Sequence, residues 1–285
     1  MVLGNISLRA QTLYWDTNGS SSGAGGTSPS DTWATSGGSN KNWTTSSGGT
    51  SNTTWWSSGA NAVFSAGSGA TGSYTVTVSG TQNVSGITVQ EGAPTLTGGT
   101  INFSDSSPDI RVASGRTLTF DNNVTSSSGN LRIGSFFYTG TTVFSNDLSL
   151  AGTVTLAGGT LRLSGSNYSF GSLNITGNST IDFAGNTTLD LTNFSISAGV
   201  TLTILNWTAM ADHFFAANWA GASYDTMGSA PMNRVTFTGF TAAETGWDSY
   251  NNEIRPNVPE PSAYGALLLG VLTVFFAWHR QKTGK

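Results

Sequence analysis

The chain has 285 residues, of which only 9% are charged and 37 are glycines, and its formal net charge at pH 7 is −4. An average soluble domain is roughly 25% charged, and without a basic patch we expect no binding of nucleic acid. The absence of cysteine excludes disulfides, thiolate metal sites and cysteine nucleophiles. Since Ser, Thr, Asn and Gly disfavour helices while Thr and Val suit strands, the composition predicts an all-β fold.

Residues 1–11 lack the apolar stretch of roughly 7–15 residues that a secretory leader needs. The segment Leu8-Arg9-Ala10-Gln11 is nevertheless similar to the end of such a leader, with a small residue before the cleavage site. We interpret residues 1–11 either as the remnant of a signal peptide whose start lies upstream or as a disordered start of a cytoplasmic chain.

Residues 12–60 are rich in Gly, Ser, Thr and Asn but also contain many tryptophans. A Trp ring in so polar a segment needs a place where it can be buried. We therefore expect loops and short strands that cap one end of the fold; the alternative is a row of exposed rings that stack on sugars. The tryptophans are Trp15, Trp33, Trp43, Trp55 and Trp56.

Residues 61–205 consist of short runs in which apolar and polar residues alternate between Gly and Asn, a pattern typical of half-buried strands. Residues 95–104 (TLTGGTINFS) are nearly repeated at 155–164 (TLAGGTLRLS), an offset of 60 that predicts three coils of roughly 20 residues. Residues 112–120 (VASGRTLTF) are similarly repeated at 196–204 (ISAGVTLTI). Glycine suits the corners, where φ is positive.

These repeats predict a right-handed parallel β-helix, a solenoid whose first and last coils need capping. The alternative is an antiparallel β-sandwich in which Gly-Gly-Thr turns a hairpin. Residues 206–256 break the rhythm and are expected to form the C-terminal cap, with Trp207, Trp219 and Trp247 covering the last coil. Within this cap we expect a short helical turn at 212–215 and strands at 234–237 and 253–255.

Groups suited to catalysis are sparse. His213 follows Asp212, and we interpret it as a satisfied residue of the cap rather than as part of a Ser-His-Asp site. Asp182 and Asp190 alternate with apolar residues, so both are expected to face solvent. No catalytic residue, cofactor or metal site is therefore predicted. The scattered carboxylates are Asp105, Asp109, Asp121, Asp147, Asp182 and Asp190.

Residues 257–285 differ from everything before them. Pro259-Glu260-Pro261 precedes the apolar stretch 263–278, and Arg280 and Lys282 follow it. As a helix of 16 residues this stretch would be about 24 Å long, slightly short of a hydrocarbon core of about 30 Å. Basic residues after a transmembrane helix keep the C-terminus in the cytoplasm. The two prolines hold the approach to the membrane extended.

This tail resembles the PEP-CTERM sorting signal. The resemblance implies export, transient anchoring in the inner membrane, recognition of Pro259, Glu260 and Pro261 by an exosortase, and association with exopolysaccharide at the cell surface or in the biofilm matrix. The phrase at residues 74–90 (YTVTVSGTQNVSGITVQ) is similar to the autotransporter-associated β-strand repeat, a resemblance that covers residues 12–205 and implies a β-helical surface protein.

Together, these resemblances lead us to expect a non-enzymatic structural or adhesin-like protein whose partners are an exosortase and surface glycans. The alternative is a polysaccharide-degrading enzyme on the same β-helix. Such an enzyme needs a groove lined by two carboxylates within about 10 Å of each other.

Overall fold

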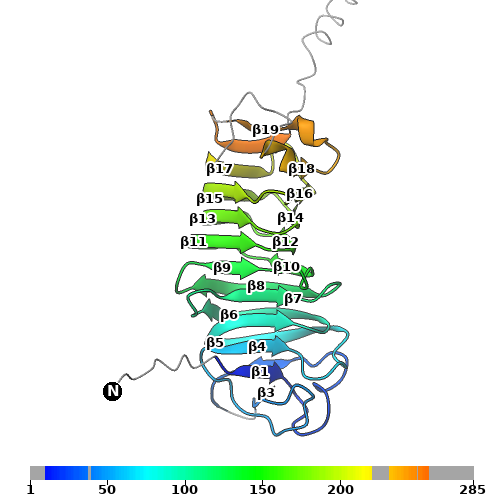
Figure 1. Cartoon of the computed structure of the whole chain (residues 1–285). Coiled ribbons are helices and arrows are strands. Elements are labelled where there is room, and N and C mark those ends of the chain that lie inside the picture. The colour runs from blue at the N-terminus through cyan, green and yellow to red at the C-terminus, as the bar shows by residue number, and fades with distance from the viewer. Residues whose placement is uncertain (1–9, 38–39, 220–230, 249, 257–285) are drawn as a thin grey trace, which may run out of the picture. The chain divides into compact units, whose positions relative to one another are not determined.

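The computed structural model describes residues 10–37, 40–219, 231–248 and 250–256 (Figure 1). Nearly all of them belong to a compact unit, Met1–Arg255, and of the second unit, Pro256–Lys285, only Pro256 is among them. No helix in these ranges is long and apolar enough to cross a membrane. The predicted membrane-spanning stretch 263–278 and the start at residues 1–9 lie outside the described residues.

The described chain is all-β, as predicted, with short 3-10 helices at Met232–Arg234 and Ala242–Glu244. The strands are β1 (Thr12–Trp15), β2 (Asp31–Trp33), β3 (Trp43–Thr44), β4 (Ala60–Phe64), β5 (Ser73–Val89), β6 (Ala93–Phe103), β7 (Asp109–Val112), β8 (Thr117–Ser126), β9 (Leu131–Ile133), β10 (Thr141–Phe144), β11 (Leu148–Leu156), β12 (Gly159–Leu163), β13 (Asn167–Ile175), β14 (Ser179–Phe183), β15 (Thr188–Ile196), β16 (Leu202–Leu205), β17 (His213–Trp219), β18 (Val235–Phe237), β19 (Thr245–Asp248) and β20 (Glu253–Pro256).

The strands form a parallel β-solenoid (Figure 1). Each circuit contributes one segment to each of three stacked faces. On one coil, residues 95–98 lie on face A, residues 100–103 on face B and Asp109–Val112 on face C. Face A continues through β8, β10, β12, β14, β16 and β18. Face C joins β4 to β17 by seven successive parallel pairings, which excludes an antiparallel sandwich.

The number of residues per coil varies, and the prediction that the 60-residue repeat spans three whole coils is wrong. Thr142 pairs with Leu161 on the next coil, whereas Leu189 pairs with Phe214 across a longer stretch of chain. Thr95 lies on face A, whereas Thr155 lies on face C. The two similar phrases are therefore strand-corner-strand units at different corners, and they are not separated by three whole coils.

The second repeat does mark equivalent positions. Residues 112–120 and 196–204 both lead from face C to face A, and each turns through a glycine with positive φ: 73° at Gly115 and 75° at Gly199. The amide of Arg116 closes the first turn by donating to the carbonyl of Ala113 at 3.0 Å. The predicted role of glycine is confirmed at both corners, where other L-residues would be strained.

The core is built from columns of inward side chains. On face A, Leu96, Phe120, Phe144, Leu163 and Phe183 follow one another in register, and all are buried. The rings of Phe120 and Phe144 stack with centroids 5.0 Å apart. Each such side chain contributes about 1.5–3 kcal/mol when fully buried, but only if the neighbouring coil covers it. The first and last coils therefore depend on their caps.

Tryptophans cover the N-terminal end of the core. Trp15, Trp33 and Trp43 are fully buried and Trp56 is 4% exposed. The ring of Trp43 lies 5.2 Å from Trp15, 4.8 Å from Trp33 and 4.7 Å from Trp56, measured between centroids. All but Trp56 also contact Phe64. These four rings form a packed cap and are not available to stack on sugars.

The fifth tryptophan of the segment, Trp55, is only partly buried, and the Lys41 ammonium lies 5.9 Å from its ring centroid. The neighbouring Trp56, by contrast, is buried, and its indole N–H donates to the Asn83 carbonyl at 3.1 Å.

The C-terminal end departs from prediction at residues 212–215. The expected helical turn is wrong, because β17 pairs with β15 along faces B and C and places Phe214 and Ala216 fully inside the core. The expected strands are present as β18 and β20, and β20 pairs antiparallel with β17. Trp219 is buried, and Trp207 and Trp247 pack against the core, so all three cover this end.

The tryptophan cap yields a prediction about stability. Trp43→Ala should lower the free energy of unfolding by about 3–5 kcal/mol, because it removes the ring that touches three other tryptophans and leaves a cavity. Urea unfolding followed by far-UV circular dichroism measures the change. Trp55→Ala is the matched control and should cost less than about 1 kcal/mol. Equal losses in the two variants would contradict the cap.

Candidate functional site

The sorting residues predicted from the sequence, Pro259, Glu260 and Pro261, and the basic residues Arg280 and Lys282 lie outside the described residues. The described residues present instead three lateral faces whose outward side chains are mostly hydroxyls and amides.

Outward side chains on face C line up from coil to coil. Arg132, Thr155, Asn174 and Ser195 are register partners on β9, β11, β13 and β15. The Ser195 hydroxyl donates to Oδ1 of Asn174 at 2.7 Å. Because neighbouring strands lie about 4.8 Å apart, this column repeats hydrogen-bonding groups along the solenoid axis at that spacing.

Face B carries a second polar column in its N-terminal half. Nδ2 of Asn102 donates to Oδ1 of Asn83 at 2.8 Å, and the Thr125 hydroxyl donates to Oδ1 of Asn102 at 3.0 Å. Beside it, Nδ2 of Asn123 donates to the Thr100 hydroxyl at 3.2 Å. These bonds link side chains across three coils and fix the direction in which each amide points.

Face A carries a column of threonines that was not predicted from the sequence. All its members are partly exposed and lie in register. Thr160 follows Thr141 after a short coil, whereas Thr236 follows Thr203 after a much longer stretch of chain. The threonines therefore do not recur at a fixed interval in the sequence. The column is Thr117, Thr141, Thr160, Thr180, Thr203 and Thr236.

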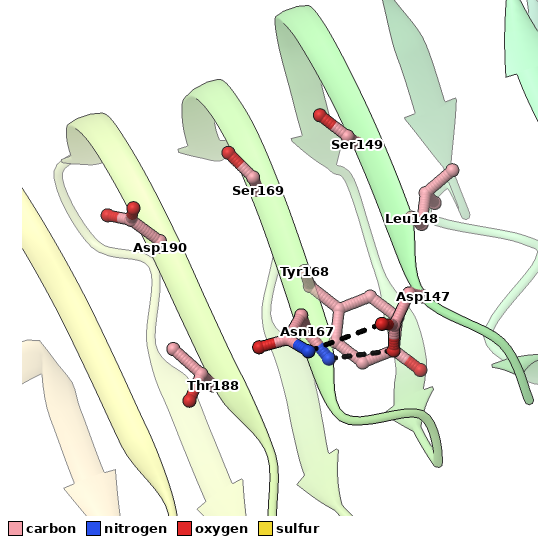
Figure 2. Close-up of a pocket in the computed structure, with 8 residues that line it drawn as sticks. All are labelled: Asp147, Leu148, Ser149, Asn167, Tyr168, Ser169, Thr188 and Asp190. Carbon is pink, nitrogen blue, oxygen red and sulfur yellow. Dashed lines mark hydrogen bonds between the residues drawn. The ribbon is translucent and has the colours of Figure 1, made fainter.

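A shallow hollow of about 350 Å³ lies on face B across β11, β13 and β15 (Figure 2). Figure 2 shows Ser149, Ser169 and Asp190 in line across these three strands. Leu148 and Tyr168 are buried beneath it. The polar lining is Asp147, Ser149, Asn167, Ser169, Thr188 and Asp190.

The Asp147 carboxylate at one side of the hollow is occupied by hydrogen bonds. Its Oδ1 accepts from the backbone amide of Asn167 at 2.8 Å, and its Oδ2 accepts from Nδ2 of Asn167 at 3.2 Å (Figure 2). Its Oδ1 also accepts from the backbone amide of Ser166 at 2.8 Å. The amide and side chain of Asn167, with the Ser166 amide, hold the pKa of Asp147 below its usual value. A carboxylate bound in this way caps a turn and is a poor general acid, because an acid needs a raised pKa.

Asp182 corrects the prediction that it faces solvent. It is only 6% exposed, although it points outward from β14. Nδ2 of Asn206 donates to its Oδ1 at 2.6 Å, and the Arg162 guanidinium lies 3.5 Å from its Oδ2. The turn after β16, which contains Asn206, covers it. Asp190, by contrast, is exposed as expected.

His213 interacts with Glu253 and not with its sequence neighbour Asp212. Its Nδ1 lies 2.8 Å from Oε1 of Glu253, and its ring stacks on Phe215 with centroids 5.2 Å apart. Asp212 is buried and accepts instead from the amides of Thr187 and Thr208 at 2.9 and 2.7 Å. His213 therefore joins β17 to β20 at the C-terminal end.

Within the described ranges, no cluster of three or more His, Cys, Asp or Glu side chains could hold a metal ion. Comparisons with protein-family models, curated proteins and solved structures find no match. The function must therefore be inferred from the fold, its surfaces and the C-terminal sequence.

The hydrogen bonds of Asp147 predict a pH-dependent contribution to stability. Because folding lowers its pKa, the contribution is complete above the ordinary value of 3.8 and is lost as the pH falls through the lowered value. Asp147→Asn should lower the free energy of unfolding at pH 7, and its difference from wild type should shrink as the pH falls below 3.8. Urea unfolding over this pH range measures it.

Asp190→Asn is the matched control, because this exposed residue lines the same hollow. Its effect at pH 7 should stay within about 0.5 kcal/mol. A gap between wild type and Asp147→Asn that stays constant from pH 7 into acid would refute the assigned role of the charge.

Proposed function

We propose that this chain is an exported structural or adhesin-like protein that an exosortase processes and that then resides at the cell surface or in an exopolysaccharide matrix. In this proposal the solenoid is right-handed, the hand that twisted parallel strands favour, and residues 263–278 anchor it in the inner membrane before processing. Its partners are the exosortase and surface glycans, and it needs no cofactor.

The C-terminal sequence carries the proposal. Because prolines favour an extended backbone, the sequence Pro259-Glu260-Pro261 before an apolar stretch would offer a processing enzyme a peptide to bind just outside the membrane. Arg280 and Lys282 after the stretch favour an orientation with the solenoid on the outer side. Prolines restrict the backbone, so the peptide loses little conformational entropy when it is bound.

The lateral faces support a role in contacting polymers. Their columns repeat hydroxyls and amides from coil to coil, with few charges between them. A regular polymer can meet such a face at several points, and many weak contacts add up through effective concentration. This geometry suits a glycan or another copy of the chain better than it suits a small substrate.

The alternative is a polysaccharide-cleaving enzyme that uses the hollow between Asp147 and Asp190. Glycoside hydrolysis needs one carboxyl with a raised pKa and a second that is free to act as base or nucleophile. The Asp147 carboxylate is bound by three donors and its pKa is lowered, so it does not suit the acid. We therefore favour the non-enzymatic role.

C-terminal mass spectrometry of the protein from exosortase-positive and exosortase-deleted cells tests this function. We expect the residues after Pro261 to be lost only where the exosortase is present. The variant Pro259→Ala/Glu260→Ala/Pro261→Ala should keep its tail in both strains, whereas Ser262→Ala, next to the motif, should be processed like wild type. Tails that persist equally in both strains would exclude exosortase processing.

A further inference from the structure

Two adjacent phenylalanines stand out from the polar surface of the solenoid. Phe136 is 87% exposed and Phe137 is 81% exposed, and their rings meet edge to face with centroids 5.1 Å apart. Burying a phenylalanine stabilises a fold by about 1.5–3 kcal/mol, a gain that both residues forgo here. Apolar side chains left outside the core in this way suggest a contact with another molecule.

The pair lies at the tip of a loop that is longer than those beside it. Seven residues, 134–140, join β9 to β10, whereas residues 157 and 158 alone join β11 to β12 at the same corner on the next coil. Residues 135–138 form a tight turn in which Ser135 and Tyr138 exchange two backbone hydrogen bonds of 3.2 Å. The aromatic tip, as we call Phe136 and Phe137, is thus an insertion into an otherwise short corner.

The base of this loop is held firmly by the coils on either side. The amide of Gly134 donates to Ile110 at 2.9 Å, and the amide of Gly140 donates to Val112 at 2.9 Å. A Cβ on Gly134 would lie 2.0 Å from the carbonyl oxygen of Gly158 on the next coil, so only glycine permits this approach. The fold therefore presents the aromatic tip in one fixed place.

A polar hollow of about 450 Å³ lies on face C, on the strand that leads into the loop. Arg132 on β9 lines it together with Asn130, Thr153 and Thr155. Within the described ranges the Arg132 guanidinium makes no hydrogen bond or ion pair. Asp109 also lines the hollow, but Arg111 binds it with an N–O distance of 2.5 Å. When Arg111 is counted together with the lining residues Asp109 and Arg132, the site carries one net positive charge.

We propose that this hollow and the aromatic tip form one binding site for an acidic polysaccharide. Arg132 binds a carboxylate of the polymer, the hydroxyls of Thr153 and Thr155 and the amide of Asn130 bond ring hydroxyls, and the aromatic tip stacks on the C–H face of a sugar ring. Phe136 lies only four positions after Arg132, so at most about 13 Å of chain separates them, and a short oligosaccharide reaches both.

The size and charge of the site favour this ligand over two others. Two phenylalanines bury about 300–500 Å², which is well below the roughly 800 Å² per partner of a stable protein interface. A membrane surface calls for a cluster of roughly 4–8 basic residues. Beside Arg132, the other arginines near the loop are Arg111 and Arg116, and these are paired with Asp109 and Glu91. A weakly bound polymer with many equivalent sugar rings needs neither a large buried interface nor a cluster of basic residues.

Binding of the full-length chain in mild detergent to immobilised polygalacturonate, with neutral dextran as the reference polymer, tests the site. Wild type should prefer polygalacturonate. Phe136→Ser/Phe137→Ser should raise the Kd at least tenfold, and Arg132→Gln should remove the preference for the acidic polymer. Tyr250→Ser, which changes an aromatic side chain that is 93% exposed elsewhere, should bind like wild type. Unchanged thermal midpoints would show that the variants fold.

Wild-type affinity in the Phe136→Ser/Phe137→Ser variant, or no binding of wild type to either polymer, would overturn the site. So would binding to phosphatidylglycerol vesicles that needs the aromatic tip while polymer binding does not. The choice of a polysaccharide rests on the proposed function, but the two fail separately. If the protein binds the polymer but is not processed by the exosortase, only the sorting role is excluded. If it is processed but its binding does not depend on the aromatic tip, only this site is excluded.

Discussion

In-register stacking of parallel coils is the interaction on which the rest of the structure depends. Each coil binds its neighbours through backbone hydrogen bonds and through inward columns such as Leu96, Phe120 and Phe144 on face A. A coil with only one neighbour leaves half of these groups unsatisfied, so a solenoid is stable only if its ends are covered. The packed tryptophans at one end and the strands β19 and β20 at the other meet that need.

The same stacking also creates the surfaces. Because the strands must stay in register, outward side chains fall into columns about 4.8 Å apart, while the corners are free to change length. Variation is therefore confined to the corners, as in the seven residues between β9 and β10 against two between β11 and β12. The same solenoid therefore presents regular lateral faces, which suit repeated contacts, and the aromatic tip, which suits a specific contact.

Much of the fold could be predicted from local pattern, because alternation and glycine report directly on strands and corners. The register of the strands could not be predicted, because it depends on the length of each corner. For this reason the 60-residue repeat was assigned to the wrong positions, and the threonine column that ends at Thr236 was not predicted. Burial of Asp182 depends on Asn206, which lies a coil away. The helical turn at 212–215 failed because tertiary pairing with β15 outweighs local preference. The aromatic tip, visible as Phe136-Phe137, could not be told from core residues by sequence.

Distances between spin labels along the threonine column test the stacking most directly, and the lack of native cysteine makes paired labelling clean. Thr141→Cys/Thr203→Cys, Thr117→Cys/Thr203→Cys and Thr117→Cys/Thr236→Cys span three, four and five coil steps. Electron double resonance should give mean distances that rise by about 4.8 Å per step, near 14, 19 and 24 Å. Distances that do not increase with the number of coils would contradict an in-register parallel solenoid.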